Sequence, residues 1–227
     1  MKTIMDILTP GNIQFMIFTG AKYSLLLAIG ALFFGVILGI IGAALKLSKH
    51  FVLRAIGNVY VEIFRGTPML LQIMFLYLAV PTVIQSFTGQ RFQADPYLCG
   101  LIAMSLNSGA YQVELIRSGI LGVDKGQWEA CETIGLNYVQ TMRYVILPQA
   151  FKRIIPPLIS EFITLIKETS AGAYICIMEL TKASDIIASR TYDYFFPLII
   201  IALIYLIMTL GLTKLVNKME VRLNAKC

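Results

Sequence analysis

The sequence predicts an all-α integral membrane protein, and three observations lead to that class. Apolar residues make up 57% of the 227 residues and charged residues only 14%, against about 45–50% and about 25% in soluble domains. Five apolar runs approach the length of about 20 residues that a helix needs to cross a bilayer. The short alternating segments of a transmembrane β-barrel are not seen. We therefore treat residues 1–227 as a single transmembrane domain.

The five predicted spans follow one another along the chain with mostly short connections. The first and the last are uncharged, the second has Glu62 and Arg65 near its start, and the fourth contains Glu161, Lys167 and Glu168. Their predicted bounds are Tyr23–Leu45, Ala55–Val80, Pro96–Arg117, Ile154–Ile177 and Tyr194–Thr213. The longest connection, residues 118–153, separates the third span from the fourth.

The distribution of positive charge predicts the orientation of these spans. With the N-terminus outside, 12 of the 19 lysines and arginines lie in the inner segments, 5 in the outer segments and 2 within spans. Positive charge favours the cytoplasmic side of a membrane. The sequence therefore predicts an outside N-terminus, a cytoplasmic C-terminus and a cytoplasmic loop at 118–153. No cleavable signal peptide is expected, because the first apolar run is too long for a signal core.

A polar, helix-like segment, Gln127–Pro148, interrupts the membrane pattern inside the long loop. Glu129 favours the positive end of a helix dipole, and Gly135 permits a left-handed exit from the first helical piece. Asn137 can cap a second piece, which Pro148 is expected to end. In that piece an apolar stripe recurs at helical spacing, formed by Val139, Met142, Val145 and Ile146. Two short helices hinged at Gly135 form the expected shape of a docking handle for another protein.

This segment resembles the EAA loop of ABC-importer permeases. The matching residues are Glu129-Ala130-Cys131, Gly135 and Ile146-Leu147-Pro148, with Cys131 where the family has a second alanine. Other stretches resemble the polar amino-acid (His/Glu/Gln/Arg) uptake subgroup, namely Glu62 to Pro68 (E-I-F-R-G-T-P), Ser108 to Tyr111, Leu147 to Ala150 and Lys167 to Ser170. After Ser170 the family usually has Leu, whereas this chain has Ala171. The resemblance covers about Leu25 to Lys218 and implies a type I ABC-importer permease architecture.

The resemblance also implies a set of partners. Two permease subunits, with a homodimer favoured, would form the pore, and a cytoplasmic ABC ATPase dimer would bind ATP and Mg. An external solute-binding protein would deliver the amino acid. The residues implied to couple to the ATPase are Trp128, Glu129, Ala130, Gly135, Leu147 and Pro148. The family also implies a bacterial plasma (inner) membrane, with membrane lipid and no nucleic acid as further partners.

No catalytic or cofactor-binding pattern is found in the chain. It lacks the G-x-x-x-x-G-K-[ST] phosphate loop, so it is not expected to be an enzyme, and energy must come from a partner or an ion gradient. No metal site is expected, because the cysteines form no Cys-x-x-Cys pair and none lies near the lone His50. These cysteines are Cys99, Cys131, Cys176 and Cys227.

Ionisable residues within a span cost several kcal/mol unless they are paired or hydrated, which makes them candidates for function. Ser160, Glu161 and Thr164 are hypothesised to face the substrate path, where Glu161 would meet an ammonium or guanidinium group. Pro156-Pro157, just before them, is expected to kink or start the fourth helix. The alternative is a structural ion pair of Glu161 with Lys167 or Arg65.

Two further pairs have structural or gating interpretations. Glu62 and Arg65 are one turn apart, which suggests a salt bridge at a helix break, with substrate contact as the alternative. Lys167 and Glu168 lie deeper and suggest gating or a second break. Glu114 and Arg117, also one turn apart, are expected to brace the entry into the handle.

Two other functions remain open from the sequence. The first is a secondary amino-acid transporter driven by an ion gradient, with Glu161 and Glu168 as proton sites. The second is a membrane scaffold without transport. The amino acid carried is predicted to be polar, with a lean towards a cationic one because of the acidic residues of the fourth span.

Overall fold

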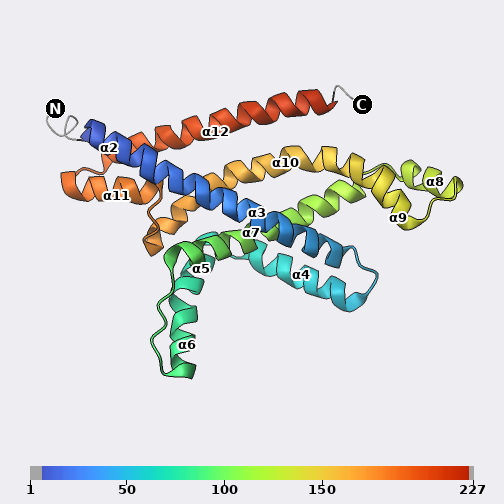
Figure 1. Cartoon of the computed structure of the whole chain (residues 1–227), viewed down its shortest axis with the longest axis horizontal. Helices are drawn as coiled ribbons and strands as arrows, with labels where there is room; N and C mark the ends of the chain where they lie inside the picture. The colour runs from blue at the N-terminus through green and yellow to red at the C-terminus, as the bar shows by residue number, and fades with distance from the viewer. Residues whose placement is uncertain (1–6, 225–227) are drawn as a thin grey trace.

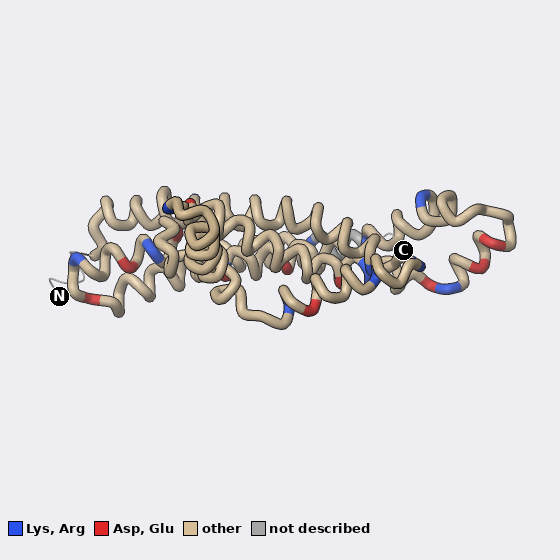
Figure 2. Tube along the Cα trace, turned by 90° about the horizontal axis from the view of Figure 1, so that it is seen from below, with Lys and Arg blue, Asp and Glu red and all other residues tan. Residues whose placement is uncertain are grey.

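The computed structural model describes residues 7–224, with side chains to Lys218, and contains no β-strand in that range. The long helices run broadly along one axis, while a short arm turns crosswise near one end and a pair of small helices stands at the other (Figure 1). Charged residues gather towards the two ends of the long axis and are sparser between them (Figure 2). This distribution suits a molecule whose middle lies in hydrocarbon.

The first helix is longer than the predicted span Tyr23–Leu45. Three elements, α2 (Pro10–Gln14), the π-helical η1 (Phe15–Ala21) and α3 (Lys22–Lys46), form one continuous helix from Pro10 to Lys46. The Thr9 hydroxyl caps its start by accepting from the Asn12 N–H at 3.3 Å, and Pro10 occupies the first turn. Proline is favoured there because its missing N–H is not needed.

The second predicted span, Ala55–Val80, is not one helix. It is divided into α4 (Phe51–Gly66) and the arm of α5 (Met69–Met74), η2 (Phe75–Ala79) and α6 (Val80–Thr88), which turns crosswise in Figure 1. Thr67 and Pro68 between them are extended, because a residue before proline avoids the helical conformation. Side chains satisfy the Phe64 carbonyl freed by the break, since Gln72 Nε2 and Asn107 Nδ2 both donate to it at 2.9 Å.

The third helix, α7 (Pro96–Leu121), covers the predicted span Pro96–Arg117. The Asp95 carboxylate caps it by accepting from the Leu98 N–H at 2.7 Å. Its buried face is built of small and polar residues and packs against α3 so closely that a Cβ on Gly39 would lie 2.7 Å from Gln112 Cβ. The adjoining core includes Leu27, Ala31, Met104, Leu165 and Ile177.

Proline affects the fourth helix differently from the prediction. The small helices α8 (Lys125–Thr133) and α9 (Tyr138–Thr141) are followed by the π-helical η3 (Met142–Ile146) and α10 (Leu147–Glu168) without a break. The expectation that Pro148 ends a helix is therefore wrong. Pro148 lies in the first turn of α10, directly after the π-helical turn, and the chain remains helical through Pro156 and Pro157. A widened turn loosens the hydrogen-bond ladder where proline supplies no N–H.

The chain changes helix type where the fourth predicted span ends. The 3-10 helix η4 (Thr169–Ile175) follows α10 and closes at Cys176, which has a left-handed φ of 62°. Two more helices, α11 (Leu180–Thr191) and α12 (Phe195–Asn224), complete the described chain. The N-terminal end lies beside α11, and the C-terminal end lies on the side of the handle (Figure 1).

Length and hydropathy single out three segments as candidate membrane spans, namely Pro10–Lys46, Met69–Thr88 and Phe195–Lys218. Two further helices, α7 and α10, are long enough at 26 and 22 residues. They do not meet the same hydropathy and charge limits. The buried face of α7 carries Asn107, Ser108 and Gln112, and α10 carries the charged residues Lys152, Arg153, Glu161, Lys167 and Glu168. The count of five spans therefore stays a prediction.

The close approach of α3 and α7 gives a stability prediction. Gly39→Ala should lower the free energy of unfolding by about 1–3 kcal/mol, because overpacking forces neighbouring groups to move. Gly211→Ala in α12 is the matched control, since nothing lies within 4 Å of a Cβ there. Thermal unfolding in detergent would measure both. Equal melting temperatures for the Gly39→Ala and Gly211→Ala variants would contradict the prediction.

Candidate functional site

The handle, Gln127–Pro148, contains most of α8 and all of α9, two short helices that a left-handed turn joins. Gly135 has a φ of +77°, as the expected left-handed exit requires. Around it Gly135 N–H donates to the Glu132 carbonyl and Leu136 N–H to the Cys131 carbonyl, each at 3.0 Å. This pattern is a Schellman motif, which closes a helix by pairing its last carbonyls.

Capping residues fix both helices of the handle. Asn137 accepts from the Gln140 N–H at 3.0 Å while the Gln140 side chain accepts from the Asn137 N–H, so the predicted Asn137 cap is confirmed as a full capping box. The first helix starts earlier than Glu129, because the Asp124 carboxylate accepts from the Gly126 N–H at 2.7 Å. Glu129 is exposed in the middle of α8 instead.

Apolar contacts and two polar contacts attach the handle to the helix bundle. Ile146 is buried, and Met142 and Val145 pack with it on a cluster that includes Ile120 and Val123. The Arg153 side chain donates to the Gly122 carbonyl, and Gln149 Nε2 donates to Gln127 Oε1 at 3.1 Å. Three members of the predicted apolar stripe therefore face the bundle, and the fourth, Val139, is exposed.

The outer side of the handle is apolar and uncovered. Ile134 is 74% exposed, Tyr138 67% and Val139 70%. Trp128 is half-buried and stacks on Tyr138, with ring centroids 6.3 Å apart. The other predicted coupling residues, Glu129, Ala130, Gly135, Leu147 and Pro148, are exposed. Exposed apolar side chains at this end of the molecule are candidates for contact with another protein.

An ionic brace holds the helices next to the handle. Glu114 Oε2 of α7 accepts from Arg117 at 2.8 Å, so the predicted pair forms, and Glu114 Oε1 also pairs with Lys46 at the end of α3. The sequence analysis missed Lys46 because it lies 68 positions from Glu114. This three-residue group ties the same ends of α3 and α7 together.

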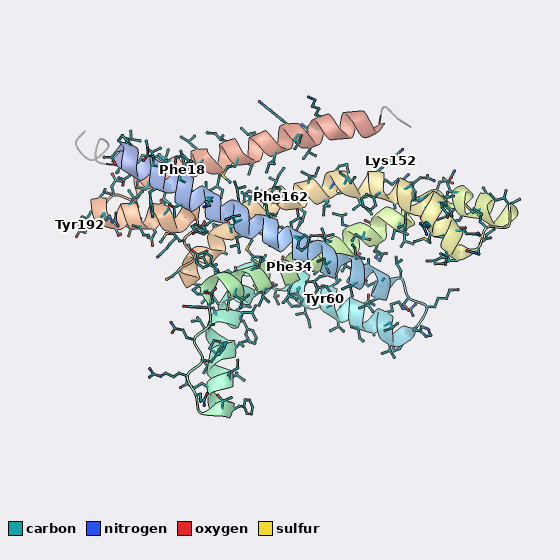
Figure 3. The ribbon with its side chains drawn as sticks, viewed as in Figure 1. Phe18, Phe34, Tyr60, Lys152, Phe162 and Tyr192 are labelled. Atoms are coloured by element: carbon teal, nitrogen blue, oxygen red, sulfur yellow. The ribbon has the colours of Figure 1, made fainter. Side chains whose placement is uncertain are left out.

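The residues predicted for the substrate path lie in the middle of α10, at the level of Phe162 in Figure 3. The Glu161 carboxylate lies near the Ser108 hydroxyl of α7, and Glu168 and Arg65 are close enough to influence it electrostatically. The neighbouring hydroxyls serve the backbone, since Ser160 donates to the Pro156 carbonyl and Thr164 to the Ser160 carbonyl, each at 3.3 Å. Three helices, α4, α7 and α10, therefore supply polar groups to one region.

The expected structural ion pairs do not form in this region. No carboxylate lies within ion-pair distance of Arg65 or Lys167 among the residues that the structure describes. Arg65 instead lies over the Tyr111 ring, with its guanidinium carbon 5.0 Å from the ring centroid. Glu62, Arg65 and Lys167 are exposed, and Glu168 is half-buried. The spacing of Glu62 and Arg65 was compatible with a pair, but the aromatic ring of α7 offers Arg65 a cation–π contact.

Two buried polar side chains were not singled out by the sequence analysis. Gln112 of α7 is fully buried, donates to the Ser108 hydroxyl at 2.9 Å and has no partner for its Oε1 atom. Glu179 is fully buried at the start of α11, where it accepts from the N–H groups of Thr181 and Lys182 and from the Tyr205 hydroxyl. A glutamine among the apolar residues of α7 was the available signal for the first. Glu179 was placed in an outer loop, so its burial could not be foreseen.

Burial raises the pKa of the Glu179 carboxyl above its ordinary value, while the bonds from Thr181, Lys182 and Tyr205 oppose that shift.

No group of three or more His, Cys, Asp or Glu side chains within the described ranges could hold a metal ion. Cys99 and Cys131 are buried and Cys176 is exposed, while Cys227 lies outside the described residues. The exposed His50 precedes α4 at the end of the bundle near Lys46.

Comparisons with known proteins fit this geometry. Residues 31–223 match the family described as binding-protein-dependent transport system inner membrane component. The chain is 36% identical over 209 residues to the arginine transport system permease protein ArtQ of Bacillus subtilis, covering 92% of this chain and 93% of that protein. It is 40% identical over 206 residues to the L-cystine transport system permease protein TcyB of the same organism, covering 90% and 85%.

A solved structure supports the same relationship. The crystal structure of an amino acid ABC transporter with histidines contains a chain that superposes with a TM-score of 0.84 at 38% identity, covering 92% of this chain and 94% of that one. The similarity extends over nearly the whole described helical bundle.

The burial of Glu179 gives a pH prediction. Because its pKa is raised in the folded protein, its protonated form adds stability at low pH, and that contribution is lost as the pH rises through the folded pKa. Glu179→Gln should remove this loss, so the stability difference between the two proteins should change with pH above about 4.5. Glu132→Gln on the exposed handle is the matched control. Melting temperatures in detergent, recorded as a function of pH, would measure this difference. Parallel pH profiles of the melting temperature for wild type and Glu179→Gln would contradict the prediction.

Proposed function

Because the chain belongs to the family of binding-protein-dependent transport system inner membrane components, we propose that it moves a polar amino acid into a bacterial cell as the permease subunit of an ABC importer. The relatives are permease subunits, and the fold is that of an ABC-transporter permease. ATP hydrolysis therefore belongs to a separate subunit. The observation that carries the proposal is the uncovered apolar handle at the end of a membrane-type helical bundle.

The proposed topology has five spans, an outside N-terminus and a cytoplasmic C-terminus. The apolar candidates Pro10–Lys46 and Phe195–Lys218 would be joined in the membrane by α7 and α10, and the second span would consist of α4 and the crosswise arm that continues it. The end of α3, the handle and the C-terminal end of α12 lie on one side of the molecule (Figure 1), which supports a common cytoplasmic face. A bacterial plasma membrane is the location that the family description, an inner membrane component, supports.

The proposed partners supply ATP hydrolysis, the second half of the pore and substrate delivery. An ABC ATPase dimer, which would bind ATP and Mg, would receive one handle from each of two permease subunits. The apolar triad Ile134, Tyr138 and Val139 would enter a groove of the ATPase, with Trp128 supporting it from behind. A homodimer is the simplest pairing, and an external solute-binding protein would deliver the substrate. Closure of the ATPases would draw the handles together and rock the bundles between outward-open and inward-open states.

The substrate path is proposed to pass Glu161, with Ser160 and Thr164 beside it. A carboxylate without an ion-pair partner in the middle of a bundle is suited to a ligand's ammonium or guanidinium group. Glu62, Arg65, Lys167 and Glu168 would act as structural or gating groups around it. The relatives are named as glutamine, arginine and L-cystine permeases, which agrees with a polar substrate. The lean towards a cationic amino acid rests on the acidic residues of α10.

The coupling proposal is tested with the whole importer in liposomes. Gly135→Pro cannot adopt the left-handed turn, and Glu129→Lys reverses a charge on the exposed side of α8. Both variants should abolish substrate-dependent uptake, or lower it at least tenfold, while the spans remain inserted. Lys182→Gln, far from the handle in α11, is the control and should keep uptake. Wild-type uptake by both handle variants would remove the handle from the mechanism.

The energy source is tested with the permease alone. Without an ATPase it should not concentrate an amino acid, even when a proton gradient is imposed. Accumulation under that gradient would favour the secondary transporter, with Glu161 and Glu168 as proton sites. Recovery of no ATPase by a chain with an intact handle would favour the scaffold.

The substrate contact is tested by Glu161→Gln, which keeps the size of the side chain and removes its charge. Loss of one charge-assisted contact, about 1.5–3 kcal/mol, corresponds to a roughly 10- to 100-fold loss of affinity for a cationic amino acid. Basal ATPase activity and expression should be unchanged. Transport assays over a range of arginine concentrations would measure this, with Glu62→Gln for comparison. An unchanged affinity would exclude Glu161 from the pocket.

A further inference from the structure

A groove of about 630 Å³ lies on the outside of the bundle, between the N-terminal helix and α12. Its volume falls within the range of about 300–1,000 Å³ that is usual for small-molecule sites. Every side chain that lines it is apolar except Lys22. It is separate from the Glu161 region and from the handle, and the proposed transport function uses none of its residues.

The groove has a closed floor and open walls. Ala21, at 8% exposure, and the half-buried Leu25 and Met208 form the floor. Phe18 and Ile207, each 71% exposed, stand on the two helices that flank it, and Phe18 is labelled in Figure 3. An elongated apolar ligand could lie between these helices and remain in contact with the surrounding hydrocarbon.

Lys22 is the one charged side chain of the groove, and it lies among the lining residues of the N-terminal helix, between Ile17 and Leu26. No carboxylate of the described residues lies within ion-pair distance of it, and its ammonium lies 5.9 Å from the centroid of the adjacent Tyr23 ring. Lys22 and Lys46 are separated by 24 positions of continuous helix, or about 36 Å at 1.5 Å per residue. Since the hydrocarbon layer is about 30 Å thick, a helix with Lys46 at one surface brings Lys22 to the other.

We propose that this groove is a binding site for one anionic glycerophospholipid. Its phosphate would lie at Lys22, and an acyl chain would run inward from there over Leu25 and Met208. The match is one of charge and polarity, because a cation at the membrane boundary beside an apolar trough has the same arrangement as an anionic headgroup on its chain.

The test uses the purified full-length permease, stripped of lipid and titrated with phosphatidylglycerol or phosphatidylcholine of identical acyl chains. Native mass spectrometry counts the lipids retained. The wild type should retain phosphatidylglycerol in preference. Lys22→Gln should lower that preference at least fivefold, whereas Arg190→Gln, a cation on α11, should leave it unchanged. Met208→Trp, which fills the floor, should reduce retention of both lipids.

Leu206→Trp is the matched control for the filled floor, because Leu206 is 50% exposed on α12 and does not line the groove. The proposal is overturned if Lys22→Gln keeps the preference for phosphatidylglycerol, or if Leu206→Trp displaces lipid as well as Met208→Trp does. It is also overturned if Met208→Trp changes the number of permease subunits in the particle while lipid retention stays the same. The groove would then be a contact between two copies of the chain.

Discussion

The contact between α3 and α7 is the interaction on which the rest of the molecule depends. Glycines on α3 let the two backbones approach until Gly39 meets Gln112 directly. Membrane helices lack a hydrophobic force that drives them together, so close packing of small residues has to supply the cohesion. With α3 fixed in this way, α7 presents Asn107 to the break after α4, Ser108 to Glu161 and Glu114 to Lys46. One helix thereby positions the candidate substrate region and the brace beside the handle.

The sequence was most informative where structure is local. The left-handed turn at Gly135 and the Asn137 cap depend on a few neighbouring residues, and both were predicted correctly. Proline had two different outcomes. The helix break expected beside Glu62 and Arg65 lies at Thr67 and Pro68, although residues 55–80 were counted as one span, whereas the end expected at Pro148 does not occur. The outcome depends on whether freed backbone groups find other partners, and these include Asn107, which is distant in sequence.

Only part of the candidate site could be predicted, because many of its contacts join residues that are distant in the sequence. A charged residue within an apolar run singles out Glu161, but the residues around it come from three helices. Their positions relative to one another cannot be predicted from their spacing along the sequence. Glu62 and Arg65 stand one turn apart and do not pair, because Tyr111 of another helix contacts Arg65. Lys46 pairs with Glu114 across 68 positions, which no local pattern could indicate. The handle was recognised because its polarity differs from that of the flanking spans.

The break at Pro68 also bears on how the protein is made. The Phe64 carbonyl at the break accepts from Asn107, which is synthesised 43 residues later. Gln72, only eight residues after Phe64, can donate to this carbonyl while the second run is being made, and Asn107 adds its bond once α7 is in place. The break therefore has a local partner from the start and gains a distant one later, which spares the carbonyl the cost of several kcal/mol that an unpaired group has in hydrocarbon. The same bond ties the start of the arm to α7 when the chain is complete.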